Sequence, residues 1–277
     1  REPDPVQPPE GPFGRVSKYA RTRDYHRVME KPLRRLARFI DQDLAPGSRT
    51  RGFVDYGPVM ERPWAERAGL GFAGKHTLLI HPKEGSFHFL AVLLTTAEIP
   101  APPADQTPPA GCGSCRMCLD ACPTGAITAP WEFDARRCLS YLTIEKQGPV
   151  DEEFWPQFKG YLFGCDICQD VCPYNRSRAR PIENSPLGPF LLPERISLKR
   201  WLEDASGQLD KIGQVSSPLR RAGPESLARN AAIVASESGD EETLGILERQ
   251  STEESHPEWL RETFRRAAQQ LRDRLNA

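Results

Sequence analysis

The sequence has no apolar run that approaches the roughly 20 residues that a membrane-spanning helix needs. Its first residues, REPDPVQPPEGP, also lack the charged-then-apolar order of a secretory signal peptide. These absences argue against a membrane partner and favour a cytoplasmic protein. The first residue is arginine rather than methionine, which indicates a processed chain or a fragment of a longer one.

The sequence also lacks an excess of positive or negative charge. The 277 residues include 37 lysines and arginines and 38 aspartates and glutamates, which leaves a formal net charge of -1. This balance excludes a protein coated in positive charge for indiscriminate nucleic-acid binding. A local basic patch can still bind a specific RNA.

Cysteine is too scarce for a disulfide-built secreted scaffold, and it is confined to one region. The chain has eight cysteines, and all of them lie between Cys112 and Cys172. Such clustering in a reducing compartment favours metal binding over a disulfide framework.

Apolar periodicity predicts a helical first segment and mixed structure after it. Helices are expected from Arg15 to Leu44, with a break near Pro32. Residues 52–55 read as a short strand, and a helix is expected from Pro58 to Gly69 or Gly71.

The rest of the chain divides at proline-rich stretches. Residues 76–96 predict two strands around a turn at 82–86. Residues 1–12 and 97–111 are rich in proline and predict extended segments, the second of which is an interdomain linker. From Ser197 onward only helical patterns remain, with small-residue packing typical of a helical repeat.

The cysteines follow the spacing C-x2-C-x2-C-x3-C-P, then a lone cysteine, then C-x2-C-x3-C-P. In the bacterial ferredoxin pattern the fourth cysteine of such a run binds a different cluster from the first three. Exchanging the fourth ligands gives two sets of four, which are Cys112, Cys115, Cys118 with Cys172, and Cys165, Cys168 with Cys122 and Cys138. The spacing therefore predicts two 4Fe-4S clusters. Two structural zinc sites and disulfides are the alternatives.

Several phrases, in the same order, closely resemble the epoxyqueuosine reductase family. These phrases are YARTRDYHRVMEKPL, VDYGPVMERPWAERAGLGFAGKHTLLIHPKEGSFHFL, CPTGAI, DARRCLSYLTIEKQGP, FGCDICQDVCPYNR and SPLRRAGPESLARNAA. The resemblance spans residues 14–235 and implies an enzyme that completes queuosine at the wobble position of tRNA anticodons. Members of the family carry further residues ahead of this region.

The resemblance implies an α+β architecture of three parts. Residues 1–105 would form a nitroreductase-like cobalamin-binding catalytic domain that lacks its N-terminal part. Residues 106–180 would form a ferredoxin-like domain with two 4Fe-4S clusters, and residues 181–277 a HEAT-like helical domain. Electrons would pass from an external low-potential donor through the clusters to cobalamin in a monomeric enzyme, and the epoxide would then be reduced with loss of water.

The family's proton donor matches Asp55. At a strand end before an expected helix, this residue suits an α/β site, but the same position also suits a helix cap. Tyr56 and Gly57 replace the serine and alanine that are common in the family beside this acid, so the pocket there is expected to differ.

Residues that match the family's cofactor-lining segments lie in three places. They are Arg23, Tyr25, His26, Lys75, His76, Thr77, Leu79 and Ser140. His76 stands where the family often has asparagine.

Arginines near the second cysteine motif and in the helical part are expected to contact tRNA phosphates. They are Arg176, Arg178, Arg180, Arg220 and Arg221, and further positive charge comes from Lys199, Arg200 and Arg229. The target base would turn outward from the anticodon loop into the pocket.

Other functions remain open at this point. A cobalamin-dependent reductive dehalogenase-like enzyme would use the same chemistry on a small molecule. A non-catalytic ferredoxin-like electron carrier would bind no cobalamin, and an RNA-binding protein would use its clusters only for structure. The segment around VDYGPVMERPWAERAGLG argues against a simple carrier.

Overall fold

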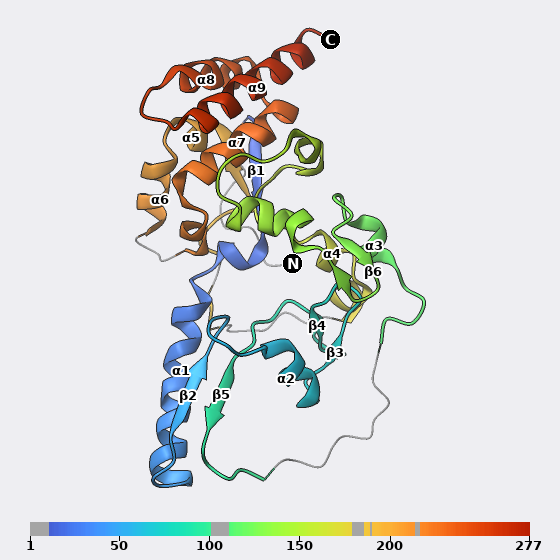
Figure 1. Ribbon diagram of the computed structural model, residues 1–277, viewed down its shortest axis with the longest axis vertical. Helices are drawn as coiled ribbons and strands as arrows, with labels where there is room; N and C mark the ends of the chain where they lie inside the picture. Colours follow the sequence, from blue (N-terminus) through green and yellow to red (C-terminus); the bar gives the residue numbers. More distant parts are fainter. Residues whose placement is uncertain (1–10, 101–110, 179–185, 189, 214–216) are drawn as a thin grey trace.

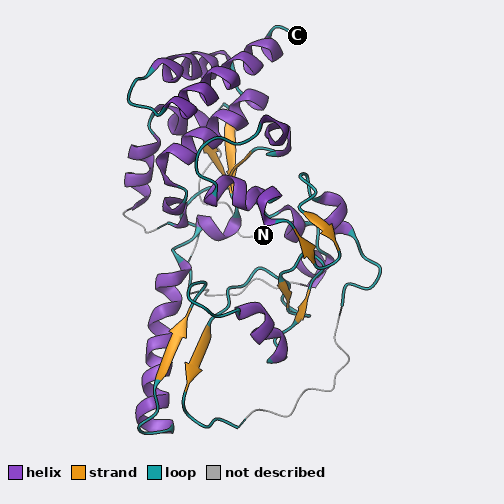
Figure 2. Cartoon of the chain, viewed as in Figure 1, coloured by secondary structure: helices purple, strands orange, loops and turns teal. Residues whose placement is uncertain are grey.

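The computed structural model describes residues 11–100, 111–178, 186–188, 190–213 and 217–277. The C-terminal helices form one end of the molecule, and α1 with strands β2 and β5 forms the other (Figure 1). The cysteine-bearing segment lies between these ends, around α3, α4 and β6. Helices dominate the C-terminal end, and the strands are short throughout (Figure 2).

The elements have the following bounds. The α-helices are α1 (Tyr25–Phe39), α2 (Glu61–Arg67), α3 (Met117–Ala121), α4 (Ile167–Asp170), α5 (Leu198–Glu203), α6 (Ala205–Gly213), α7 (Gly223–Ser238), α8 (Glu241–Thr252) and α9 (Glu258–Leu275). The strands are β1 (Phe13–Val16), β2 (Thr50–Phe53), β3 (Phe72–Ala73), β4 (Leu79–Ile80), β5 (Val92–Thr95), β6 (Ile127–Ala129), β7 (Glu132–Phe133), β8 (Tyr161–Phe163) and β9 (Arg195–Ser197). Shorter helical turns are η1 (Lys18–Arg21), η2 (Ile40–Leu44), η3 (Ala135–Arg137), η4 (Tyr141–Glu145), η5 (Glu152–Gln157), η6 (Tyr174–Arg178) and η7 (Pro218–Arg221).

Helix α1 begins at a side-chain cap and runs without a break through proline. The Asp24 carboxylate accepts a hydrogen bond from the backbone N–H of His26 at 3.0 Å. The predicted break near Pro32 is wrong, because this residue is exposed and water can bond the carbonyl that the ring leaves without a donor. The predicted helical start at Arg15 is also wrong, since Arg15 lies in β1.

The strand predicted at 52–55 is observed two residues earlier, as β2, and residues 76–96 contain the two predicted strands β4 and β5. Their partners differ from the expectation. Strand β2 pairs antiparallel with β5, whereas β4 pairs with β3. The two strands of residues 76–96 therefore do not pair with each other. Helix α2 begins three residues later than Pro58 and ends at Arg67, and Met60 before it has a non-helical backbone with a ψ of 88°.

A small sheet joins the first strand to distant parts of the chain. Strand β1 lies between β8, to which it is parallel, and β9, to which it is antiparallel. Gly14 is required here, because a Cβ at this position would lie 2.8 Å from the Cβ of Leu162. The N-terminal strand thus packs against the cysteine-bearing and helical parts.

The main core lies among the C-terminal helices and the segments that pack on them. Leu227, Ile233 and Phe264 are fully buried, together with Leu142 and Leu162 from η4 and β8. The prediction that helices alone follow Ser197 is confirmed within residues 198–213 and 217–277. In the part of the chain that the structure describes, no helix is long and apolar enough to cross a membrane.

Candidate functional site

Four cysteines form one group beside α3. Cys118 lies within electrostatic range of Cys112 and Cys172, and Cys172 lies within range of Cys112 and Cys115. Burial raises the pKa of both Cys118 and Cys172, and the neighbouring sulfurs raise it further. The tertiary structure thus brings a cysteine of the second motif to the first three.

The other four cysteines form a second group beside the first. Cys168 lies within electrostatic range of Cys165, Cys138 and Cys122, and also of Cys118 in the first group. Burial raises the pKa of Cys165 to about 12. Because iron binds thiolates, loading either group must release protons.

Neither group forms a compact site for one ion. Within the described ranges, no three histidine, cysteine, aspartate or glutamate side chains converge closely enough to hold a single metal ion.

Backbone and hydroxyl donors face the sulfurs. The N–H of Lys75 lies 3.4 Å from the Sγ of Cys112. Burial raises the pKa of Cys138, and the nearby N–H groups of Ser140 and Tyr141 and the Ser140 side chain oppose this shift. Hydrogen bonds to cluster sulfurs raise the reduction potential, and Ser140 therefore lies where it can influence the second group.

Lys75 joins the first cysteine group to the N-terminal part. Its Nζ donates to the carbonyls of Gly113 at 2.7 Å and Cys115 at 2.9 Å. The Trp131 backbone N–H donates to the Lys75 carbonyl at 3.1 Å, and its indole N–H donates to the Ala73 carbonyl at 2.9 Å. The Lys75 ammonium is thus occupied by the cysteine loop, and Trp131 is a contact that the sequence did not reveal.

His76 is buried and Thr77 is half-buried in a strained turn next to Lys75. His76 is 3% exposed, and burial lowers its pKa to about 4, so its ring is neutral. Its Nδ1 accepts from the N–H of Leu78, whereas its Nε2 is buried without a partner. Thr77 has a φ of +68°, which is rare for a β-branched residue and typical of functional sites. Leu79 is buried in β4.

Asp55 lies just past the end of β2, with its side chain held by Tyr25. The Tyr25 hydroxyl donates to Oδ2 of Asp55 at 2.5 Å. The Tyr25 ring stacks between His26 and Phe89, each at a centroid distance of 4.1 Å. Burial, followed by the bond to Asp55, raises the pKa of Tyr25. The cap alternative for Asp55 is wrong, because α2 begins after Met60 without a side-chain cap.

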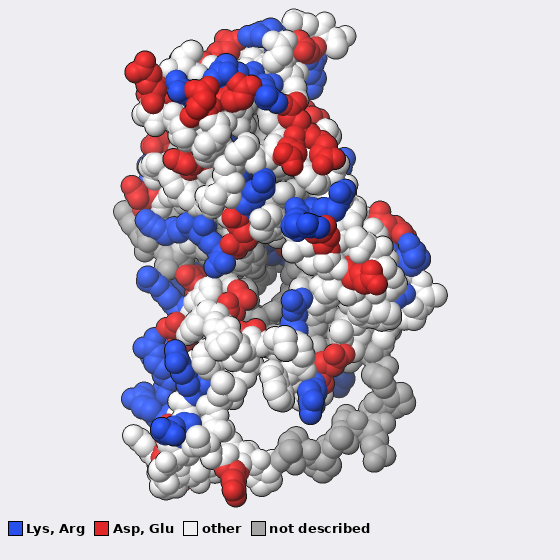
Figure 3. All heavy atoms as spheres, viewed as in Figure 1, with Lys and Arg blue, Asp and Glu red and all other residues white. Residues whose placement is uncertain are grey.

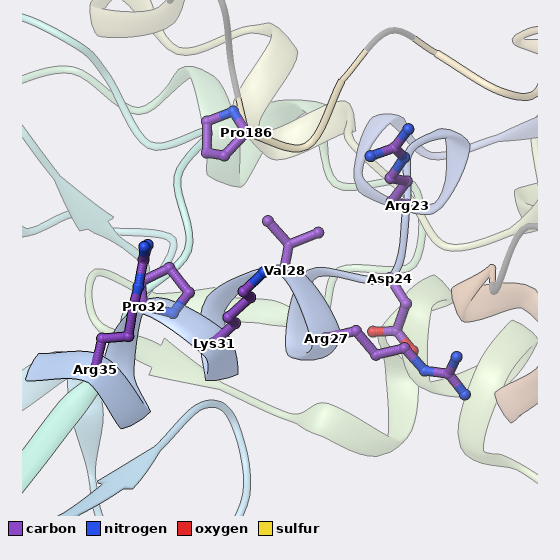
Figure 4. Close-up of a pocket in the computed structure, with 8 residues that line it drawn as sticks. All are labelled: Arg23, Asp24, Arg27, Val28, Lys31, Pro32, Arg35 and Pro186. Atoms are coloured by element: carbon purple, nitrogen blue, oxygen red, sulfur yellow. The ribbon is translucent and has the colours of Figure 1, made fainter. Parts of the chain in front are cut away.

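Arg23 lies apart from these groups. It lines an open hollow of about 410 Å³ beside α1, across from Pro186 (Figure 4). Of the eight residues expected to line a cofactor, Tyr25 and His26 lie at Asp55, and four lie in the Lys75–Leu79 turn. Ser140 lies at the second cysteine group, and Arg23 lies in this hollow.

Two of the arginines expected to contact tRNA are paired with acids. Arg220 lies 3.6 Å from Asp210, and Arg221 donates to Glu145 at 2.5 Å. Both remain partly exposed, so their pairs would have to open or adapt to admit a phosphate.

The other expected tRNA residues are placed unevenly. Arg176 is exposed, and its Nε donates to the Asp170 carbonyl at 2.8 Å. The side chain of Arg178 and the whole of Arg180 lie outside the described residues. Arg229 is 0% exposed, so the expectation that its charge faces tRNA is wrong.

Arg229 instead stabilises the backbone that follows Cys138, a member of the second cysteine group. Its guanidinium donates to the carbonyls of Leu142 at 2.7 Å, Lys146 at 2.7 Å and Gly148 at 2.6 Å, and to Oδ1 of Asn230 at 2.8 Å. Burial lowers the pKa of Arg229 to about 10. A lone arginine in the apolar run LARNAAIVA was the one sequence signal of this role.

Asn230 extends the same network toward Cys165. Its amide donates to the carbonyls of Thr143 at 2.7 Å and Leu162 at 2.9 Å. The Thr143 hydroxyl accepts from the N–H of Gly164 at 2.9 Å, one residue before Cys165. Helix α7 therefore fixes both segments that lead to Cys138 and Cys165.

Comparison with known families gives two matches along the chain. Residues 111–175 match a family described as a 4Fe-4S double cluster binding domain. Residues 2–56 match a family described as epoxyqueuosine reductase QueG, DUF1730.

Similar whole proteins carry the same description. Epoxyqueuosine reductase of Shigella dysenteriae is 42% identical over 248 residues, which cover 88% of this chain and 63% of that protein. The Gloeobacter violaceus enzyme is 39% identical, with 86% and 73% covered. A crystal structure of epoxyqueuosine reductase with an epoxyqueuosine-modified tRNA-Tyr stem loop matches with a TM-score of 0.84 and 30% identity, covering 96% of this chain and 70% of that one. This chain therefore spans less than two thirds of the Shigella relative.

Proposed function

The chain belongs to the epoxyqueuosine reductase family, and from this premise we propose that it reduces epoxyqueuosine to queuosine at the wobble position of tRNA anticodons. The reaction breaks both C–O bonds of the epoxide and leaves a carbon–carbon double bond. Two electrons and two protons are consumed, and the oxygen leaves as one water.

One observation carries the proposal, namely that the eight thiols form two adjacent groups and that one group is bonded to the N-terminal part. Cys168 lies within electrostatic range of Cys118 across the groups. Cys112 accepts from the N–H of Lys75, which precedes the strained His76–Thr77 turn. This arrangement suits electron delivery into the N-terminal part, which an isolated structural metal site would not need.

The two groups are proposed to hold two 4Fe-4S clusters with exchanged fourth ligands. Cys112, Cys115, Cys118 and Cys172 would hold the first cluster, and Cys122, Cys138, Cys165 and Cys168 the second. The electrostatic neighbours within each group support this assignment.

Cobalamin is the second proposed cofactor, and the residues present fit it in one respect. His76 is neutral, and its Nε2 is a buried donor without a partner in the described residues, as expected beside an absent polar group. Contacts are proposed from Tyr25, His26, the Lys75–Leu79 turn, Ser140 and Arg23. Bound and reduced cobalamin would supply low-potential electrons for the epoxide.

Asp55 is proposed to deliver a proton to the oxygen that leaves. Tyr25 occupies Oδ2 of Asp55, which leaves Oδ1 to carry the proton. The stacked rings of Tyr25 and Phe89 fix the hydroxyl that orients this carboxyl group. The wobble base would turn out of the anticodon loop to reach it.

Further details of the proposal concern architecture and partners. The N-terminal part is proposed to be nitroreductase-like and the helices from α5 to α9 HEAT-like. The enzyme is proposed to be a cytoplasmic monomer that takes electrons from an external low-potential donor and contacts tRNA through Arg176, Arg178, Arg180, Arg220 and Arg221.

The test is conversion of an epoxyqueuosine-containing anticodon stem-loop by anaerobically reconstituted protein with cobalamin and a strong reductant. Loss of one oxygen from the nucleoside, detected by mass spectrometry, is expected with wild type and not with Asp55→Asn. Reduction of the clusters with no conversion would instead favour an electron carrier. Cobalamin binding with no conversion would favour a small-molecule substrate.

A further inference from the structure

Exposed cations recur along α1 and just before it. Arg23, Arg27, Lys31 and Arg35 are spaced four residues apart, and all four are exposed. Arg27, Lys31 and Arg35 lie on α1, where residues at this spacing are neighbours on the helix surface and rise about 6 Å per step along the axis, whereas Arg23 precedes the cap residue Asp24. They line the open hollow of about 410 Å³ that Pro186 borders (Figure 4).

The row lacks compensating acids, although the whole chain is slightly acidic. Residues 23–38 contain six lysines and arginines and only two acids. Of these acids, Asp24 bonds His26 and Glu30 pairs with Arg34 at 2.5 Å. Within the described part of the chain, no member of the row forms an ion pair with any acid.

Helix α9 shows what a neutralised basic helix looks like in the same molecule. Arg265 pairs with Glu258 at 2.5 Å, and Arg272 pairs with Glu248 at 2.5 Å. Red and blue atoms alternate over α8 and α9, whereas blue atoms gather along α1 (Figure 3). The charge on α1 is therefore a feature of that helix rather than of the surface in general.

The row begins at the end of α1 whose first residue, Tyr25, bonds the candidate proton donor. Arg23 lies two residues before Tyr25, which donates to Asp55. From there the row leads away along α1 toward Arg35 at the other end. A polyanion with one unit at Asp55 could extend along this face.

We propose that the Arg23–Arg27–Lys31–Arg35 row binds the sugar-phosphate backbone of the RNA whose base reaches Asp55. This inference rests on the proposed function and names a surface that the sequence did not single out for RNA. Unpaired exposed cations release counterions from phosphates without first losing an acid partner, unlike Arg220 and Arg221. Contacts of this kind position the RNA and do not read its sequence.

The test is the salt dependence of stem-loop binding by the reconstituted full chain. In the variant Arg27→Gln, Lys31→Gln, Arg35→Gln, the Kd for an anticodon stem-loop is expected to rise. The slope of log Kd against log salt concentration is expected to fall by roughly three, about one for each lost phosphate contact. A stem-loop with a changed stem sequence should be affected equally.

Two matched variants control for net charge and for folding. Arg265→Gln, Arg266→Gln, Arg272→Gln makes the same change in net charge on α9 and should leave the slope unchanged. Arg27→Lys, Arg35→Lys keeps the charge of the row and should bind close to wild type. Thermal unfolding of each variant identifies any that does not fold.

The outcomes separate this inference from the proposed function. If wild type converts the stem-loop but the row variant binds like the α9 variant, the inference is overturned and the function stands. If wild type binds RNA through the row but converts nothing, the function fails and the surface stands. Row-dependent binding to anionic phospholipid vesicles, with RNA binding unchanged, would overturn the inference in favour of a lipid surface.

Discussion

At the scale of single residues, the contact that matters most for chemistry is between Tyr25 and Asp55. Asp55 has a φ of +52°, a left-handed conformation that aspartate tolerates better than most residues. The Tyr25 ring stacks on Phe89, and its hydroxyl donates to one carboxylate oxygen of Asp55. Orientation of the carboxyl group therefore depends on a residue thirty positions earlier in the chain.

Tyr25→Phe is expected to lower kcat for the stem-loop roughly ten- to a hundredfold, because a hydrogen bond to a carboxylate is worth about 1.5–3 kcal/mol. The ring stack survives this change, so folding should not suffer. Tyr56→Phe is the control, since its hydroxyl lies 3.4 Å from Glu30 and does not contact Asp55. Equal rates for the two variants would contradict an orienting role for Tyr25.

His76 should make stability depend on pH. Its pKa is about 4 in the folded protein against 6.5 for the free side chain, so between these values the unfolded state binds a proton that the folded state does not. Stability is therefore lost as pH falls through this window, by about 2 kcal/mol between about pH 7 and pH 5.

The check on this prediction is urea unfolding of reconstituted protein at several pH values. His76→Asn removes the titrating group, and its free energy of unfolding should fall less steeply toward acid than that of wild type. Identical pH dependence in the two proteins would show that His76 is not buried in its neutral form.

At the scale of elements, α7 controls the backbone that carries two cysteines of the second group. Arg229 and Asn230 bond carbonyls in η4, in the loop that follows it and in β8. The carbonyls of Leu142, Thr143 and Leu162 would otherwise be buried without these donors, which costs about 1–3 kcal/mol each. The pair thus couples the C-terminal helices to Cys138 and Cys165.

Arg229→Met should lower the free energy of unfolding by about 3 kcal/mol, because one buried and two partly buried carbonyls lose their donor at once. It should also lower iron retention, with the loss confined to one of two cluster signals in electron paramagnetic resonance. Ser236→Ala is the control on the same helix, since that hydroxyl bonds only the Ile233 carbonyl of α7 itself. Full iron content and wild-type spectra in Arg229→Met would refute the coupling.

At the scale of the whole molecule, the proposed clusters join segments that are far apart in sequence. Cys122 belongs to the first motif but lies with Cys138, Cys165 and Cys168. Cys172 belongs to the second motif but lies with Cys112 and Cys118. The two clusters should therefore assemble together with the fold of residues 111–175.

Cys122→Ala is expected to lose about half of the bound iron, because one of two equal clusters loses a ligand. The remaining spectrum should be that of the cluster on Cys112, Cys115, Cys118 and Cys172. The matched variant Cys172→Ala should lose the other half. If Cys122→Ala instead abolished the cluster on Cys112 to Cys118, the exchange of fourth ligands would be wrong.

Much of the chemistry was predictable from local patterns. Cysteine spacing alone pointed to two sets of four, since the ligand exchange follows from the short loops between thiols. The helices after Ser197 likewise depend on neighbours in sequence. These features are local because turns, caps and short ligand loops are decided by a few adjacent residues.

Other features depended on which segments meet. Residues 76–96 form strands β4 and β5, which pair with β3 and β2 respectively and not with each other. Burial decides this pairing, rather than proximity in the chain. Arg229 reads as a surface cation until α7 is seen packed against η4, and the bond from Tyr25 to Asp55 appears only when α1 meets the end of β2. The sequence by itself therefore determined which residues serve as cluster ligands and as the candidate acid. Long-range packing decided their partners, their burial and the balance of charge around them.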